Sequence, residues 1–284
     1  MGKKGAMAKP KINPYALLQR IRRQQPVVHH LTNWVTIYDC ANVVKVLGAS
    51  PVMAHAREEV AQMTEIASAL VLNIGTLTPE LVEAMKWAAL SANGRGIPVV
   101  LDVCGAGATD LRDRACFELL DEARIDIIKG NASEVARING ENVRTRGVDA
   151  SRVDQDLAAV ARELARKRRC TVVVTGKEDL VADERRLYVV KNGHPLMGHL
   201  VGTGCMAASV IGTFAAVEAD LGYAATAGLI CFEVAAEEAA QGSLGPGTFK
   251  ERLFDCLYHL NKRTIDQRQK VEVCEDSTSS PTRV

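Results

Sequence analysis

The sequence lacks several features that define large classes of proteins. Its eight cysteines form no C-x-x-C pair and follow no regular spacing, which argues against a disulfide framework or a zinc site and fits reduced thiols in a cytosol. No apolar run approaches the roughly 18 residues needed to span a bilayer. Residues 1–11 are basic with no apolar segment after them, so no secretory signal is expected. The net charge of +1 indicates no surface for nucleic acid or for a membrane.

Two common catalytic motifs are missing as well. No G-x-x-x-x-G-K-[ST] sequence is present, so the protein is not a P-loop enzyme. The absence of G-x-S-x-G leaves a Ser-His-Asp hydrolase unsupported. His29, His30 and His55 have no partner at metal-ligand spacing, and we expect them to pack or to hydrogen-bond within the fold.

Apolar runs alternate with helical patterns along most of the chain. Runs such as Ala69–Asn73 and Ile97–Asp102 are typical of strands buried on both faces. Strands that alternate with helices predict an α/β fold of three layers, in which helices cover both faces of a mostly parallel central sheet. Two short strands near residues 180–182 and 187–191 predict an antiparallel extension of that sheet.

The organisation of the chain indicates a single domain over residues 12–268, because no repeat and no Pro/Gly/Ser-rich linker interrupts them. Residues 1–11 and the Ser/Thr-rich residues 269–284 are expected to be disordered tails. Ser151 is expected to cap a helix that runs to about residue 167. Further helices are expected at about 204–217, 222–241 and 247–266.

A glycine-rich turn late in the chain precedes a helix of small residues. Gly202 and Gly204 allow positive φ and the close approach of a ligand. The helix directs its unpaired N–H groups and the positive end of its dipole at this turn. Gly202, Thr203 and Gly204 therefore predict an anion site, with Cys205 in the first helical turn, where a thiolate is stabilised. The alternative is a tight connection in which Cys205 is only a small buried residue.

The same turn also matches the dinucleotide-binding fingerprint as Gly202-x-Gly204-x-x-Ala207. That fingerprint should follow a strand and begin a βαβ unit. Here it lies late in the chain and only helices follow, which disfavours a Rossmann dehydrogenase.

Charged residues stand at the ends of two predicted strands. Asp102 ends one strand, Lys129 ends another, and Glu134 begins the helix that follows. Two carboxylates at strand ends can hold Mg²⁺ directly or through water, beside nucleotide phosphates, and Lys129 can neutralise a phosphate. In the alternative interpretation Glu134 complements the dipole of its own helix, Asp102 caps a turn and Lys129 is an exposed strand-end lysine.

From residue 28 to residue 238 the sequence closely resembles the hydroxyethylthiazole kinase family of the ribokinase-like superfamily. The stretches GASPVM and LNIGTL are specific to that family, whereas the late Gly-x-Gly is shared by the superfamily, which usually has Asp where this chain has Cys205. The resemblance is carried by residues 30–33 (HLTN), 47–53 (LGASPVM), 72–77 (LNIGTL), 105–109 (GAGAT), 130–134 (GNASE), 174–176 (VTG) and 202–205 (GTGC).

The resemblance implies a ribokinase-like fold and phosphoryl transfer from ATP to the hydroxyl of 4-methyl-5-(2-hydroxyethyl)thiazole, a step of thiamine salvage. It also implies a cytoplasmic, Mg²⁺-dependent homotrimer with sites between neighbouring subunits. The positions that match the family give Met53, Gly202 and Asn33 near the thiazole, Lys129 and Thr175 at ATP, Asp102 and Glu134 at the metal, and Cys205 as the candidate base.

Two positions depart from the family pattern. Val103 and Cys104 stand where the family usually has Pro-Val, which loosens the turn but keeps the carboxylate of Asp102. Lys129 stands where the family often has Arg, which keeps the charge but not a bidentate phosphate contact.

Two other functions remain open from the sequence. The first keeps the fold and changes the substrate, as in a kinase for pyridoxal or hydroxymethylpyrimidine, or an ATP-dependent nicotinamide-hydrate dehydratase. Such relatives are expected to have Asp at position 205. The second is a non-catalytic protein that senses a thiazole or a nucleotide, although such a sensor need not keep the groups that transfer a phosphoryl.

Overall fold

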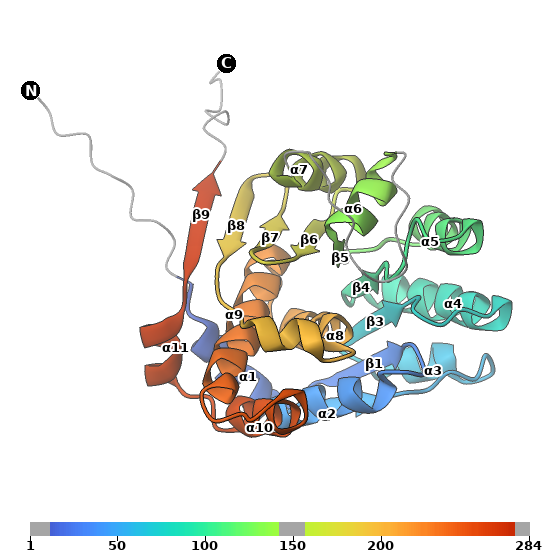
Figure 1. Cartoon of the computed structure of the whole chain (residues 1–284). Coiled ribbons are helices and arrows are strands. Elements are labelled where there is room, and N and C mark those ends of the chain that lie inside the picture. The colour runs from blue at the N-terminus through green and yellow to red at the C-terminus, as the bar shows by residue number, and fades with distance from the viewer. Residues whose placement is uncertain (1–11, 142–156, 276–284) are drawn as a thin grey trace, which may run out of the picture.

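A single sheet of nine strands runs through the protein, whose computed structural model describes residues 12–141 and 157–275 (Figure 1). The strand order is β2-β1-β3-β4-β5-β6-β7-β8-β9. The strands are β1 (Val27–Leu31), β2 (Ser50–Val52), β3 (Ala69–Asn73), β4 (Val99–Asp102), β5 (Ile127–Asn131), β6 (Thr171–Thr175), β7 (Asp179–Ala182), β8 (Arg186–Val190) and β9 (Val271–Glu275).

The first six strands pair in parallel, and β7, β8 and β9 extend the sheet in antiparallel fashion. This arrangement follows from the connections. Helices join the parallel strands, whereas short turns join β6 to β7 and β7 to β8, which permits only antiparallel pairing. The predicted mostly parallel sheet with an antiparallel extension is confirmed.

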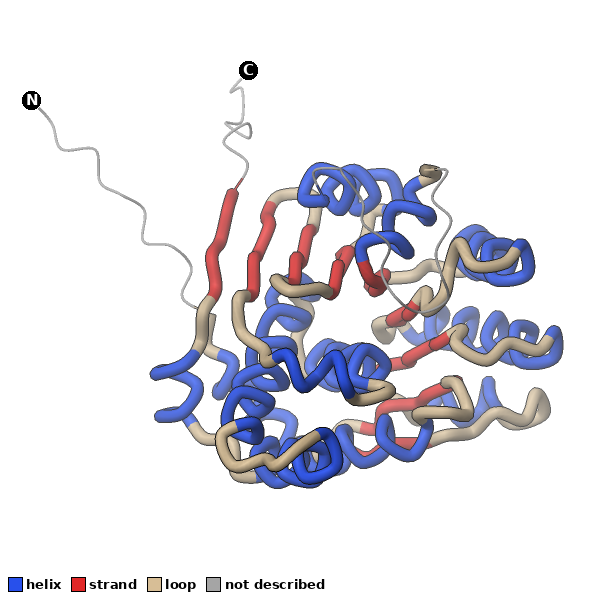
Figure 2. The backbone as a smooth tube through the Cα atoms, viewed as in Figure 1, coloured by secondary structure: helices blue, strands red, loops and turns tan. Residues whose placement is uncertain are grey.

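Helices cover both faces of the sheet, and Figure 2 shows the strands between them. One group is α1 (Pro14–Gln24), α2 (Ile37–Leu47), α8 (Thr203–Ala215), α9 (Leu221–Ala240), α10 (Pro246–Tyr258) and α11 (Lys262–Arg268). The other is α3 (Val60–Glu65), α4 (Pro79–Arg95), α5 (Asp110–Glu122), α6 (Ala132–Asn139) and α7 (Leu157–Arg168). A 3₁₀ helix, η1 (Pro195–His199), precedes α8.

Alternate residues of each central strand belong to different cores. In β3, Val71 packs with the first group of helices and Leu70 with the second, and both side chains are almost fully buried. Strands buried on both faces account for the continuous apolar runs of the sequence. The three-layer prediction is confirmed.

Helix α8 approaches the sheet unusually closely at Gly212. A Cβ atom at this position would lie 2.3 Å from Cγ2 of Val71. Glycine is therefore required for α8 to lie against β3, and this contact sets the height at which the N-terminus of α8 stands over the strand ends.

Two predictions about the end of the chain are wrong. Residues 247–266 do not form one helix, because the side chain of Asn261 accepts a hydrogen bond from the N–H of Thr264 and so begins α11 as a separate helix. Residues 271–275 are not part of a disordered tail but form β9, which pairs with β8. Alternation of Val271 and Val273 with polar residues is a strand signal, and both valines pack against the core.

Several predictions fall on residues outside the described part of the chain. These are the N-terminal tail 1–11, the start of a helix at Ser151, and residues 276–284 of the predicted C-terminal tail. No helix in the described residues is long and apolar enough to cross a membrane.

Candidate active site

The carboxyl ends of the parallel strands meet the N-terminus of α8 at one edge of the sheet, which is where ligands bind in open parallel sheets. Asn73 ends β3 and Asp102 ends β4, and the strand register places these two residues side by side. Lys129 of β5 lies next to Asp102 on the other side. Helix α8 packs over β3 and β4, so its first turn stands above this row of polar side chains.

Two asparagine side chains connect the end of β1 to Asp102 and to Cys205. Asn33 Nδ2 donates to Asn73 Oδ1 at 2.9 Å, and Asn73 Nδ2 donates to Asp102 Oδ2 at 2.7 Å. Both amide groups also donate to Sγ of Cys205, at 3.3 and 3.4 Å. Asn33 is held in place because its Oδ1 accepts a hydrogen bond from the backbone N–H of Thr36 at 3.0 Å. The sulfur atom of Cys205 is therefore surrounded by donors.

The surroundings of Cys205 favour its thiolate. The thiol of Cys104 donates a hydrogen bond to Cys205, and this contact is the largest factor that lowers the pKa of Cys205 to about 5. Burial opposes the shift, while the charge of Lys129 and hydrogen bonds from Thr36 and Asn33 support it. The same contact, together with burial, raises the pKa of Cys104. Cys104 thus keeps its proton while Cys205 gives its own up.

Lys129 and Asp102 form a buried ion pair beneath α8. The Lys129 Nζ atom lies 3.3 Å from Asp102 Oδ1, and the two residues are 4% and 0% exposed. Burial raises the pKa of Asp102, and the positive charge of Lys129 offsets part of that rise and favours the carboxylate. Burial lowers the pKa of Lys129, but the charges of Asp102 and Glu134 outweigh this and raise it. A Cβ atom on Gly204 would lie 3.2 Å from Nζ, so the ammonium reaches the first turn of α8.

Glu134 has a structural role in this site. Its Oε1 accepts a hydrogen bond from the N–H of Gly105, and its Oε2 accepts one from the N–H of Asn131, both at 2.7 Å. The side chain of Asn131 accepts in return from the N–H of Glu134, which makes a capping box at the start of α6. The alternative in which Glu134 serves its own helix is therefore present in the structure, and the carboxylate also fixes the turn after Asp102.

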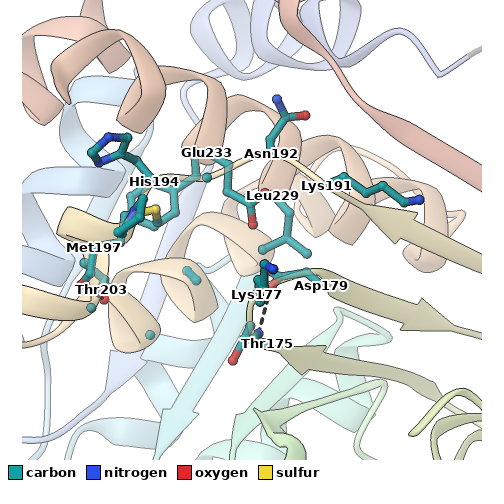
Figure 3. Close-up of a pocket in the computed structure, with 17 residues that line it drawn as sticks. Thr175, Lys177, Asp179, Lys191, Asn192, His194, Met197, Thr203, Leu229 and Glu233 are labelled. Carbon is teal, nitrogen blue, oxygen red and sulfur yellow. Dashed lines mark hydrogen bonds between the residues drawn. The ribbon is translucent and has the colours of Figure 1, made fainter. Parts of the chain in front are cut away.

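A cavity of about 690 Å³ opens beside the start of α8 (Figure 3). Thr203 and Gly204 of α8 line one part of it, and Thr175, at the end of β6, lines another. Gly202, with φ of +96°, is the N-cap of α8. The first N–H groups of a helix have no acceptor within it, so they are free to bind an anion beside this cavity.

The comparisons with known proteins agree with this geometry. The sequence model of the hydroxyethylthiazole kinase family matches residues 18–263. A hydroxyethylthiazole kinase from Methanosarcina mazei is 53% identical over 255 residues, which cover 90% of this chain and 98% of the relative. The chain belongs to the hydroxyethylthiazole kinase family. Another member, from Thermoanaerobacter pseudethanolicus, is 46% identical over 258 residues, which cover 90% and 98% of the two chains.

Solved structures support both the family and its fold. A hydroxyethylthiazole kinase protein from Pyrococcus horikoshii OT3 has a TM-score of 0.85 and 40% identity, and the match covers 92% of this chain and 99% of that one. A ribokinase-like superfamily protein from Enterococcus faecalis, 14% identical, has a TM-score of 0.59 over 81% and 86% of the two chains. The predicted ribokinase-like fold of this kinase family member is confirmed.

The remaining predicted site residues lie along the same edge of the sheet. Met53 follows β2, one strand beyond Asn33, and its carbonyl oxygen accepts a hydrogen bond from His55 Nδ1 at 2.8 Å. The His55 ring packs against Trp34 with ring centroids 4.8 Å apart, which ties the β2 end to the β1 end. Thr175 donates to the carbonyl of Gly130 at 3.4 Å.

Sequence reasoning missed Asn73 and the donor role of Cys104. Asn73 ends its apolar run as Asp102 ends the next one, so the same strand-end argument that selected Asp102 could have selected Asn73. In the sequence, Cys104 stands out only as a departure from the family pattern. Its contact with Cys205 joins residues far apart in the chain, and no local pattern signals it.

The low pKa of Cys205 predicts a distinctive pH dependence of alkylation. Iodoacetamide reacts with thiolates, so its rate at Cys205 should be half-maximal near pH 5 and should fall as the pH drops below that value. Mass spectrometry of the Cys205 peptide would follow the reaction. Cys256, whose pKa burial raises, is an internal control that should react only in alkaline solution. A half-maximal rate at Cys205 near pH 8.5, the value of a free thiol, would contradict the assignment.

Proposed function

We propose that this protein transfers the γ-phosphoryl group of ATP to the hydroxyl of 4-methyl-5-(2-hydroxyethyl)thiazole, giving the thiazole phosphate and ADP in thiamine salvage. The observation that supports this most directly is the position of Cys205. Its sulfur lies in the first turn of α8, directly after Gly204 of the cavity wall, and the side chains of Asn33 and Asn73 both donate to it. Membership of the hydroxyethylthiazole kinase family supports the choice of substrate.

The chain's own groups are suited to phosphoryl transfer, which requires positioning and charge neutralisation more than covalent chemistry. The N–H groups of Gly202, Thr203 and Gly204 would bind the transferring phosphoryl at the helix N-terminus. Lys129, which reaches Gly204, would neutralise charge on the same group. Thr175 would contact ATP from its position on the cavity wall. Asn33, Met53 and Gly202 would hold the thiazole.

Asp102 and Glu134 fit a hydrated Mg²⁺ ion better than a dehydrated one. Carboxylate oxygens are the ligands this ion prefers, but each of these carboxylates already accepts hydrogen bonds from the protein. No group of three potential ligating side chains occurs in the described residues. Water ligands would therefore connect the ion to Asp102 and Glu134. When bound, Mg²⁺ would neutralise phosphate charge and align the phosphoryl group for attack.

In the proposed mechanism Cys205 would accept the proton of the attacking hydroxyl. The lowered pKa of Cys205 favours its thiolate, and the amides of Asn33 and Asn73 donate to the sulfur and hold it in position. We expect the Cys205→Ala variant to lose about 100-fold in kcat, since general base catalysis contributes 10²–10⁴-fold. The measurement is steady-state kinetics on folded protein. A loss of less than tenfold would show that the hydroxyl attacks with little prior deprotonation and that Cys205 is not an essential base.

We also propose a cytoplasmic homotrimer in which the sites lie between subunits. Four large apolar side chains beside the thiazole residues are exposed: Trp34 (57%), Val35 (68%), Tyr38 (74%) and Val201 (71%). The two segments that carry them touch, because a Cβ atom on Gly202 would lie 2.7 Å from Thr36 Cγ2. A contiguous apolar patch of this kind is typical of an interface. All eight cysteines are free thiols, which supports a reducing compartment.

Charge placed in this patch should dissociate the assembly. We expect light scattering to give three times the mass of one chain for the native protein and the mass of one chain for the double variant Val35→Asp, Tyr38→Asp. The kinase activity of the dissociated double variant should also fall, since the proposed site is incomplete in a single subunit. Leu90→Asp, at a residue that is 52% exposed on α4 and away from the patch, is the matched control and should leave the mass unchanged. A native protein with the mass of one chain would refute the trimer.

The reaction itself is tested by ADP release with Mg-ATP and hydroxyethylthiazole, with pyridoxal and hydroxymethylpyrimidine as alternative acceptors. Thiazole-dependent ADP release, with formation of the phosphate ester, is expected. Turnover with only one of the other alcohols would keep the fold and reject the substrate. Nucleotide binding without turnover of any acceptor would indicate the sensor instead.

A further inference from the structure

Two carboxyl groups face each other on the wall of the cavity beside α8, at a place that the transfer chemistry does not use. Glu233 comes from α9 and Asp179 from the start of β7, and both line the cavity (Figure 3). They are 5% and 6% exposed, and their side chains are hydrogen-bonded to each other. Two carboxyl groups can form such a bond only if one of them holds a proton.

The surroundings indicate that Glu233 holds this proton. Asp179 Oδ1 accepts a hydrogen bond from the N–H of Gly176 at 2.9 Å, which favours its ionised form. Oε2 of Glu233 is completely buried and has no N–H or O–H donor in the described residues, so it is the oxygen suited to carry the proton toward Asp179, and Oε1 is left as the acceptor. Burial raises the pKa of Glu233 well above its ordinary value, and the charge of Asp179 raises it further. Glu233 is therefore a neutral acid that donates to Asp179 and retains an acceptor oxygen.

The acceptor oxygen of Glu233 lies where the base of a bound nucleotide is expected. The phosphates belong at the N-terminus of α8, where Thr203 and Gly204 line the cavity. The base must then lie toward the rest of the wall, which includes the apolar side chains of Met197, Leu229 and Phe232. Apolar side chains beside a few polar groups are typical of a site for a planar ring with one recognised edge, and Glu233 stands on the same helix as Leu229 and Phe232.

We propose that Glu233 accepts a hydrogen bond from the 6-amino group of adenine and so selects ATP over nucleotides with an oxygen at that position. This inference rests on the proposed function, because it takes the cavity to be the ATP site. Asp179 is the positioning residue of the pair, since it accepts a hydrogen bond from the acid group of Glu233 and so leaves the other oxygen of that group as the acceptor. A 6-oxo group would place a second acceptor against that oxygen, and the hydrogen bond that adenine makes would be lost.

Inosine triphosphate is the matched probe, because it differs from ATP only along this edge of the base, with an oxygen in place of the 6-amino group and a proton on N1. The measurement is the ratio of kcat/KM for ATP to that for inosine triphosphate at fixed hydroxyethylthiazole. We expect a ratio of about 10–100 for the native protein, the range that one unsatisfied buried group produces. Glu233→Leu should reduce it to about 1–3, mainly through KM for the nucleotide. Glu233→Gln should keep the native ratio, because the amide donates to Asp179 and offers an oxygen as the neutral acid does.

The control Glu238→Gln lies on the same helix and does not line the cavity, so its ratio should equal the native one. A native ratio below about threefold overturns the proposal, and this result does not depend on whether Glu233→Leu folds. Loss of the preference for ATP in the Glu233→Gln variant would overturn the assignment of Glu233 as a neutral acid. If the protein phosphorylates no acceptor, the preference for adenine can still be measured by binding. The ratio of the dissociation constants for inosine diphosphate and ADP, measured without thiazole, then replaces the kinetic ratio. Failure of the proposed reaction is thus separated from failure of base recognition.

Discussion

Replacing Asp102 with Asn is expected to reduce kcat by at least about 100-fold and to destabilise the protein by about 3–5 kcal/mol, the cost of breaking a buried ion pair by removing one partner. Asp102 is fully buried, and its loss would leave the ammonium of Lys129 without its counter-charge beneath α8. The Asn side chain would also meet the amide of Asn73, which now donates to Asp102 Oδ2 at 2.7 Å. The carboxylate of Asp102, which is proposed to bind Mg²⁺ through water, would be lost at the same time.

Steady-state kinetics and urea unfolding of the Asp102→Asn variant would measure the two effects separately. Asp126→Asn is the matched control, because Asp126 lies at the amino end of β5 and accepts from the N–H of Val99 at 2.9 Å. Its kcat should stay within about threefold of the native value, since no part of the transfer site touches it. A folded Asp102→Asn variant with kcat within tenfold of native would remove Asp102 from the mechanism.

Gly212→Ala is expected to destabilise the protein by about 2–3 kcal/mol, although alanine is the better helix former. The added methyl group would lie 2.3 Å from Val71 Cγ2, and Val71 is itself held between β1 and β4 in the middle of the sheet. The strain can be relieved only if α8 moves away from β3. That movement would displace Cys205 and the first N–H groups of α8, so kcat should fall as well.

The matched control is Gly94→Ala in α4, where no atom lies within 4 Å of the added Cβ. This change should stabilise the protein by about 0.5–1 kcal/mol, because only the helix propensity differs. Both variants can be compared by urea unfolding. A Gly212→Ala variant that matches the native protein within about 0.5 kcal/mol would show that the helix and the sheet are not in rigid contact at this point.

The sequence predicted the elements that have their own local signals. Buried strands such as β3 are continuous apolar runs, and the turn at Gly202 combines two glycines with a helix of small residues. The strand β9 was missed because the Ser/Thr-rich residues after it dominated the composition of the C-terminus. The break before α11 depends on one capping side chain, Asn261, which helical periodicity alone does not reveal.

The parts of the candidate site that the sequence could not predict depend on contacts between distant segments. Asp102 and Lys129 were selected one at a time as strand-end residues, but only the parallel register of β4 and β5 makes them a buried pair. Glu233 lies within a helix that is buried almost throughout, so no local pattern distinguishes it. Its role follows from Asp179, which meets it from strand β7 of the sheet.

The separation of the site's parts along the chain has a consequence for how the protein folds during synthesis. Asn33 and Cys205 contact each other across 172 positions. On the ribosome, all six parallel strands emerge before α8 does, and this helix is needed to cover one face of the sheet. Pairings over such distances are slow to form and leave apolar surface exposed meanwhile. The proposed site can therefore form only after most of the chain has been made, so its ligands could not stabilise an earlier stage of synthesis.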